Sequence, residues 1–325
     1  MVPVREIRRD PLTGEEVVIS PDRVIERIPD PGPPLDPADC PFCPGHETWT
    51  TPAIDETHRD GRWVARAFPN RRPALGIEGD PAPWHDGPFT GMRAVGAHEV
   101  IVEAPEHAPL FVLPVERTVD ALALAVRRMR DLRRDVRFRT LQWFRNQGMG
   151  AGASQPHPHA QIVALPIVPR RITALVERAR SHLAATGQPL LAAIRDAELH
   201  GAERVVFEQD GIVVCCPFAP RHAFEVWLIP AAPGPSLADA TASEIESLAR
   251  AMHRISIALA AVVGKAPITA TALGAPEIDD RSGLGWHVRM APRLVPHGGF
   301  EESTGLALHS VFPERAAGLL REVDR

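Results

Sequence analysis

The sequence predicts an α+β fold in which antiparallel sheets are flanked by helices and the chain contains a tandem duplication. In the first half, two strand patterns, a long helical pattern and two further strand patterns follow one another, which indicates an antiparallel-dominated unit. The second half repeats this order, and HAFEVWLIP (222–230) stands where HEVIVEAP (98–105) stands in the first half. We therefore predict one domain over residues 1–168 and a second over 169–325.

The elements of the first half follow from its polar and apolar periods. A turn over Asp10–Gly14 precedes the first strand. The Gly- and Pro-rich stretch 76–96 is predicted to be a loop of a length usually found in functional or disordered segments. Thr118 is the predicted N-cap of a helix that runs to Asp135. The predicted strands cover 17–20, 63–68, 98–105 and 138–145.

The second half contains more helical pattern than the first. The tail has Gly298-Gly299 and Thr304-Gly305, which predict tight turns before the last helix. The predicted helices cover 169–185, 189–198, 241–263 and 313–323, and the predicted strands cover 204–208, 211–217, 223–229, 268–273 and 285–292.

Composition excludes several classes of protein. The 325 residues carry a net charge of −5, so no overall basic field points to a nucleic-acid partner. No run of about 18 apolar residues predicts a membrane span, and the N-terminus lacks the apolar core of a signal peptide. We therefore expect a cytoplasmic protein with neither a membrane nor a nucleic-acid partner. Cys215 and Cys216, in an apolar strand pattern, are expected to be buried core thiols.

The strongest functional signal lies in Asn146–Pro166, NQGMGAGASQPHPHAQIVALP. Strand alternation would send His157, His159 and Gln161 to one face. The small-residue loop before them is typical of loops whose backbone amides hold a phosphate, although such a loop alone is usually a turn. An imidazole nucleophile beside a phosphate site predicts transfer of a phosphoryl or nucleotidyl group through a histidine adduct.

A Cys-x-x-Cys pair, Cys40 and Cys43, offers either a tetrahedral metal site or a redox pair. A redox pair is expected at the start of a helix, but proline follows each cysteine and no helical pattern begins there. A metal would need two further ligands, for which His107 and His157 are the best candidates. His46 is a competing third ligand.

The pattern N-x-G-x(5)-S-x-P-H-P-H-x-Q at 146–161 resembles the signature of galactose-1-phosphate uridylyltransferases, the transferase branch of the histidine triad superfamily. This resemblance implies a tandem histidine-triad-like fold whose second copy is degenerate. It also implies that His159 is the nucleophile that forms a nucleotidyl-histidine intermediate, with Cys40, Cys43, His107 and His157 as ligands of a structural zinc ion. The phosphates would contact Gln161, Ser154, Asn146 and Gly152.

Further stretches resemble the same family. The opening RRDPLTGEEVVISPDR places a phosphate-binding arginine at Arg23, and the uridine pocket maps to Phe68 and Asn70. Arg71 stands where well-known uridylyltransferases have aspartate, and P-N-x-x-P-A-L resembles the related ADP-glucose phosphorylases. The tail G-G-F-E-x-x-T-G does so too, which makes Phe300 and Glu301 site candidates or, alternatively, part of a plain loop.

The resemblance also bears on cofactors and assembly. The family's second, iron-binding site needs histidines where this chain has Leu273, Arg289 and Ala291, so no iron site is expected. Family members are dimers, which implies a homodimer here.

The leading functional prediction is ping-pong transfer of a uridylyl group between UDP-glucose and galactose 1-phosphate. The alternatives are an adenylyl-transferring phosphorylase acting on ADP-glucose or a similar nucleotide, and a non-catalytic nucleotide-binding or zinc-dependent interaction module.

Overall fold

The computed structural model describes residues 4–22, 36–278, 282–296 and 298–324. Its centre is a ten-stranded sheet in the order β10-β11-β12-β14-β13-β8-β9-β7-β4-β3, with every neighbouring pair antiparallel. The strands are β3 (Asp55–Arg59), β4 (Arg62–Pro69), β7 (Ala97–Val102), β8 (Thr140–Gln147), β9 (His159–Leu165), β10 (Val205–Gln209), β11 (Ile212–Cys215), β12 (Val226–Pro230), β13 (Ile268–Leu273) and β14 (His287–Pro292).

This strand order confirms the α+β prediction and shows how the two halves are related. Outward from the central β8–β13 pair, β9, β7, β4 and β3 on one side correspond to β14, β12, β11 and β10 on the other. The two copies therefore form a single continuous sheet, and β8 and β13 join them by main-chain pairing, for example between Asn146 and Thr269.

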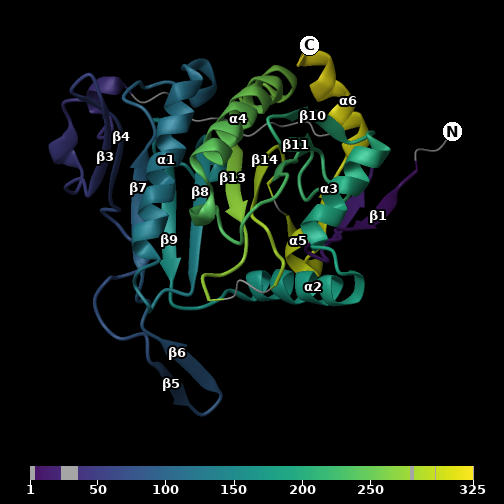
Figure 1. Cartoon of the computed structure of the whole chain (residues 1–325), viewed down its shortest axis with the longest axis horizontal. Coiled ribbons are helices and arrows are strands. Elements are labelled where there is room, and N and C mark those ends of the chain that lie inside the picture. Colours follow the sequence, from purple (N-terminus) through teal and green to yellow (C-terminus); the bar gives the residue numbers. More distant parts are fainter. Residues whose placement is uncertain (1–3, 23–35, 279–281, 297, 325) are drawn as a thin grey trace.

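Helices cover the two faces of the sheet unequally. α1 (Val115–Leu132) and α4 (Ala242–Val263) lie side by side across one face, one from each half (Figure 1). Their apolar stripes pack with alternate strand residues such as Ile101, Ile162 and Leu228 in the main core. The remaining helices are α2 (Arg170–Thr186), α3 (Leu190–Gly201), α5 (Gly299–Thr304) and α6 (Pro313–Val323).

Among the described residues, helices cover the opposite face only in the second half. There, Leu175 of α2 and Leu191 of α3 pack on Trp227 and Ile229 of β12, together with Leu12 from the N-terminal segment. That segment forms β1 (Glu6–Arg9) and β2 (Glu16–Ile19), and β2 pairs in parallel with β15 (Ala307–His309) near the other end of the chain. In the first half the same face carries the loop that contains Cys40 and Cys43 (the cysteine loop), together with a cleft.

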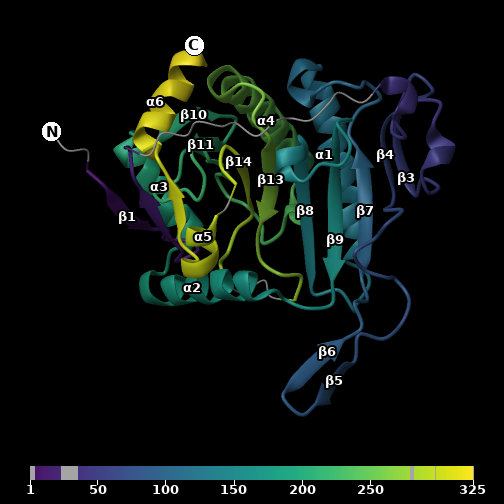
Figure 2. The same cartoon turned by 180° about the vertical axis from the view of Figure 1, so that it is seen from behind.

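Several sequence predictions were wrong in detail. α1 begins at Val115 after Pro114, whose fixed φ suits a helix start, so Thr118 lies inside the helix and is buried. The stretch 76–96 contains a hairpin, β5 (Pro83–Asp86) and β6 (Phe89–Met92), that projects from the body (Figures 1 and 2). The tail adds α5 and β15 to the predicted turns.

Within the described residues, no helix combines the length and the apolarity that crossing a membrane requires.

A buried histidine in β14 predicts acid sensitivity of the fold. His287 is 0% exposed, and neither of its ring nitrogens has a hydrogen-bond partner among the described residues. Burial, reinforced by nearby Arg289, lowers its pKa from 6.5 to about 3. Above pH 6.5 His287 is neutral in both the folded and the unfolded chain, and it does not change the free energy of unfolding. As pH falls from 6.5 toward 3, protonation of the unfolded chain lowers the free energy of unfolding by about 1.4 kcal/mol per pH unit.

We expect His287→Phe, which keeps a planar ring against Trp227, to remove this part of the pH dependence. Urea unfolding of both proteins between pH 7 and pH 4.5 should show a difference in the free energy of unfolding that grows in favour of the variant as pH falls. Parallel curves for the two proteins would contradict the assignment.

Candidate active site and metal centre

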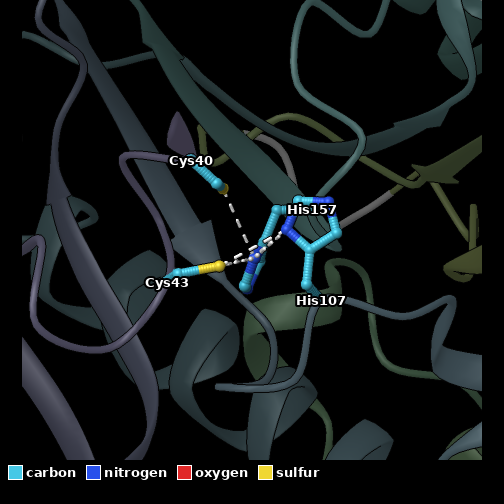
Figure 3. Close-up of side chains that lie close together, drawn as sticks. All are labelled: Cys40, Cys43, His107 and His157. Carbon is cyan, nitrogen blue, oxygen red and sulfur yellow. Dashed lines mark hydrogen bonds between the residues drawn. The ribbon is translucent and has the colours of Figure 1, made fainter. Parts of the chain in front are cut away.

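Four side chains from three separate segments form a compact cluster in the first half. Cys40 and Cys43 lie in the loop before β3, His107 follows β7, and His157 precedes β9. Their ligand atoms all lie within 4.8 Å of one another, and Figure 3 shows the four side chains converging. Cys40, Cys43 and His157 are buried, and His107 is half-buried. The structure thus brings together the four ligands expected from the sequence.

The spacing of these atoms fits a tetrahedral metal. Cys43 Sγ lies 3.4 Å from His107 Nδ1 and 3.6 Å from His157 Nδ1, Cys40 Sγ lies 3.6 Å from His157 Nδ1, and the two Nδ1 atoms are 3.4 Å apart. Tetrahedral zinc, with bonds of about 2.0–2.3 Å, separates its ligand atoms by about 3.3–3.8 Å. Two thiols and two imidazoles are also the donors of closed structural sites.

Hydrogen bonds to the backbone determine which ring nitrogen of His157 and of His46 has a lone pair that could bind a metal. His157 Nε2–H donates to the Ala104 carbonyl over 2.8 Å, so Nδ1 keeps its lone pair for the cluster. Burial, then the neighbouring imidazoles, lower the pKa of His157 to about 4, so its ring is neutral at pH 7. His46, the competing ligand, lies outside the four: its Nδ1–H donates to the Cys40 carbonyl over 2.7 Å.

His159 is held by the segment that carries the cluster. Its Nδ1–H donates to the His157 carbonyl over 2.8 Å, which leaves the Nε2 lone pair free to react. Phe42, which lies between the two cysteines, packs against the ring with centroids 5.3 Å apart. Burial, and to a smaller extent Arg145, lower the pKa of His159, so the neutral ring predominates at pH 7. The imidazole is therefore neutral and oriented with an unprotonated Nε2, as a nucleophile requires.

A cleft of about 750 Å³ opens beside His159. Cross-strand pairing sets its floor, because Phe68 of β4 pairs with Val100 of β7, and Val100 pairs with Gln161 of β9. The charged side chains that line the described part of the cleft are Arg71 and Arg72. Such a cleft suits an anionic, partly aromatic ligand.

Gln161 is oriented by a histidine that the sequence analysis did not single out. His98 Nδ1 accepts the Ala74 N–H over 3.1 Å, so its Nε2–H donates to Gln161 Oε1 over 2.6 Å. The amide group of Gln161 is thereby directed into the cleft as a donor. Alternation along the predicted strand 98–105 places His98 on the face of Val100, and this was the signal that could have identified it.

The loop 148–154 differs from the predicted array of open amides. The amides of Ala151 and Ala153 donate to the Gly148 carbonyl, and that of Gly152 donates to Met149, so these three donors are already used. Gly152 has φ +90°, a conformation that favours glycine, and an added Cβ would lie 3.5 Å from Asn146 Nδ2. The loop therefore covers Asn146 closely, while Ser154 and Gln155 line the cleft.

The remaining predicted site residues divide into three groups. Phe68 and Asn70 line the cleft, although Phe68 is only 3% exposed. Phe300 and Glu301 lie in α5; Glu301 borders a small cavity with Arg221 and does not line the cleft of its own chain. Arg23 lies outside the described residues.

Fold and site together define an enzyme of the nucleotidyltransferase and phosphorylase class. Residues 2–169 match the family model described as galactose-1-phosphate uridyl transferase, N-terminal domain, which is more than half of the chain. The chain therefore belongs to the galactose-1-phosphate uridylyltransferase family.

Similarity to individual relatives extends over almost the whole chain. An ADP-glucose phosphorylase of Arabidopsis thaliana is 29% identical over 98% of this chain and 93% of its own. A galactose-1-phosphate uridylyltransferase of Thermotoga maritima is 26% identical over 98% of each. The crystal structure of an Arabidopsis thaliana ADP-glucose phosphorylase with bound ADP-glucose superposes with a TM-score of 0.85 at 27% identity, covering 99% of both chains.

Proposed function

We propose that this enzyme transfers a nucleotidyl group between a nucleotide hexose and a phosphate-bearing acceptor through a covalent adduct on His159. The observation that carries the proposal is the hydrogen bond from His159 Nδ1–H to the His157 carbonyl, which leaves Nε2 as the reactive atom at a cleft that suits an anionic ligand. The family membership supports the same reaction class.

The reaction proceeds in two displacements. The Nε2 lone pair forms a bond to the α-phosphorus while the bond from that phosphorus to the bridging oxygen breaks, so hexose 1-phosphate leaves with the bridging oxygen. A phosphate oxygen of the acceptor then attacks the same phosphorus, and the histidine nitrogen leaves. The Gln161 amide, held by His98, donates to the phosphoryl oxygens, on which negative charge increases.

The cluster of Cys40, Cys43, His107 and His157 would hold a zinc ion in a closed site, which supplies rigidity and offers no open coordination position. That rigidity reaches His159 through the His157 main chain, because the carbonyl that orients the nucleophile belongs to a ligand residue.

Two donors are candidates. The first is UDP-glucose with galactose 1-phosphate as acceptor, which the family model and the full-length similarity to a uridylyltransferase support. The second is ADP-glucose with orthophosphate as acceptor. Arg71 supports this donor, because it lines the cleft at the position where well-known uridylyltransferases have aspartate. The similarity of the chain to ADP-glucose phosphorylase supports it as well.

Labelling of the protein without acceptor separates the two donors. We expect incubation with UDP-glucose or ADP-glucose to add one nucleotidyl group to the chain, detected by intact mass, with one donor reacting much faster. Galactose 1-phosphate and orthophosphate, each added to the isolated adduct, then identify the acceptor by which one discharges it. A protein that turns over either donor yet never carries the label would contradict the covalent route.

Dimerisation remains a prediction. Because Phe300 and Glu301 do not line the cleft of their own chain, a substrate role for them would require a partner subunit.

A further inference from the structure

A tryptophan that the motifs do not explain lies on the wall of the active-site cleft. Trp49 ends a short 3-10 turn (Glu47–Trp49) just after the cysteine loop, and it lines the same cleft as His159. It is 47% exposed, whereas Phe42, Phe68 and His159, which also line the cleft, are 9%, 3% and 5% exposed. Of these four aromatic rings, that of Trp49 has the largest fraction of its surface open to a ligand.

One face of the Trp49 ring is already covered. The His46 imidazole stacks on it with centroids 3.9 Å apart and an angle of 6° between the planes. A planar ring supported on one face, and otherwise exposed in a cleft, offers its second face for stacking with a flat ligand group.

The support beneath Trp49 is rigid. The His46 ring is held by its Nδ1–H donation to the Cys40 carbonyl over 2.7 Å, and the Trp49 amide donates to the His46 carbonyl over 2.9 Å. At the start of the turn, Trp63 Nε1–H donates to Glu47 Oε1 over 2.8 Å. The position of the indole therefore depends on the main chain of a cysteine in the metal cluster.

Trp49 belongs to a segment that lies beside β4, across the sheet from β9, which carries His159. Thr51, two residues on, donates its hydroxyl to the Pro69 carbonyl, which places this segment beside the end of β4. One strand, β7, lies between β4 and β9, so at about 4.8 Å per neighbouring pair β4 is about 10 Å from the strand that carries His159. A nucleotide whose phosphate reaches His159 would therefore extend its base toward Trp49.

We propose that Trp49 is the platform on which the base of the nucleotide substrate stacks. His46 is a positioning residue that connects this platform to the loop that contains Cys40 and Cys43. The proposal rests on the proposed function, because it assigns the base-binding end of that substrate.

Mononucleotide binding tests the platform directly. UMP and AMP lack a hexose phosphate leaving group, so calorimetric titration reports binding without labelling His159. For the mononucleotide that binds wild-type protein, we expect Trp49→Ala to weaken affinity by about tenfold, a typical loss for one stacked base, and Trp49→Phe to restore most of it. Trp84→Ala, an exposed tryptophan on the projecting hairpin, is the matched control and should bind as wild type.

Tryptophan fluorescence gives an independent reading. Nucleotide should quench the emission of wild-type protein, and the quenching should be lost in Trp49→Phe although the other five tryptophans remain. Equal affinities of wild type and Trp49→Ala would overturn the proposal, as would failure of wild type to bind either mononucleotide.

His46 variants test the coupling. We expect His46→Ala to weaken mononucleotide binding by about threefold to tenfold with metal content unchanged, and His46→Phe, which retains a stacking ring, to recover part of the affinity. Loss of metal from His46→Ala would make His46 a ligand and overturn its assigned role.

A failure of the stacking platform and a failure of the covalent route would give different results. Labelling of His159 by a saturating nucleotide sugar in both wild type and Trp49→Ala, with unchanged binding in the variant, would reject the platform alone. Binding that depends on Trp49 in a protein that never becomes labelled would reject the covalent route alone.

Discussion

Replacing His159 with asparagine is expected to eliminate the nucleotidyl adduct and to lower turnover by roughly 10⁴- to 10⁶-fold, the usual result of removing a covalent nucleophile. The asparagine amide can still donate to the His157 carbonyl, as His159 Nδ1–H does now, so the local main chain should be preserved. The substitution removes the outer ring atoms Cε1 and Nε2, and with them the reactive nitrogen. Intact mass after incubation with nucleotide sugar and steady-state turnover are the two measurements.

The control for this substitution is His85→Asn, which makes the same chemical change on the exposed hairpin outside the cleft. It should label and turn over as wild type. A His159→Asn protein that still forms an adduct would place the nucleophile elsewhere, and one that retains its full biological role would favour the non-catalytic binding module.

Disrupting the metal cluster is expected to produce the second large effect. Cys43→Ser should lose one equivalent of bound zinc, measured by elemental analysis, and should unfold at lower temperature. Structural zinc contributes on the order of 10 kcal/mol to peptides that fold around it. Loss of even a third of that would lower the Tm of a chain of this length by about 5 °C or more. Activity should fall too, because His157 both belongs to the cluster and orients His159.

A matched control exists within the chain. Cys215→Ser makes the same substitution at a fully buried core cysteine of β11, so it should cost stability without changing zinc content. If Cys43→Ser retains a full equivalent of metal, the four-residue site is wrong. A different metal in the purified protein, with the same dependence on Cys43, would correct the ion and leave the ligands in place.

The site residues that could be predicted from the sequence are those that belong to short contiguous motifs. Cys40 and Cys43 have the spacing of metal ligands, and His157 and His159 flank a single proline. Side-chain chemistry therefore indicated the kind of site, and the family resemblance assigned the role of each residue. His98 and Trp49 belong to no motif. The roles inferred for them depend on contacts in the folded chain: the hydrogen bond from His98 to Gln161, and the stacking of Trp49 on His46 at the wall of the cleft.

The same distinction holds for the fold. Helices such as α4 have a strong period of their own, and the prediction of 241–263 agrees with Ala242–Val263. β3 has intermediate and exposed residues without a clear apolar face, so its strand character comes from pairing with β4. The parallel pairing of β2 with β15 joins residues almost 300 positions apart, and no local pattern encodes such a contact.

The β8–β13 ladder has a consequence for how the enzyme can be divided. A fragment ending near residue 168 would contain His159 and the whole cluster of Cys40, Cys43, His107 and His157. In that fragment β8 would become a bare sheet edge with unpaired main-chain donors and acceptors. The apolar side of α1 that faces α4 would be uncovered as well. The second half thus covers the sheet edge and the helix face of the first half, and a minimal version of this enzyme would need a substitute for that cover before it could remain monodisperse.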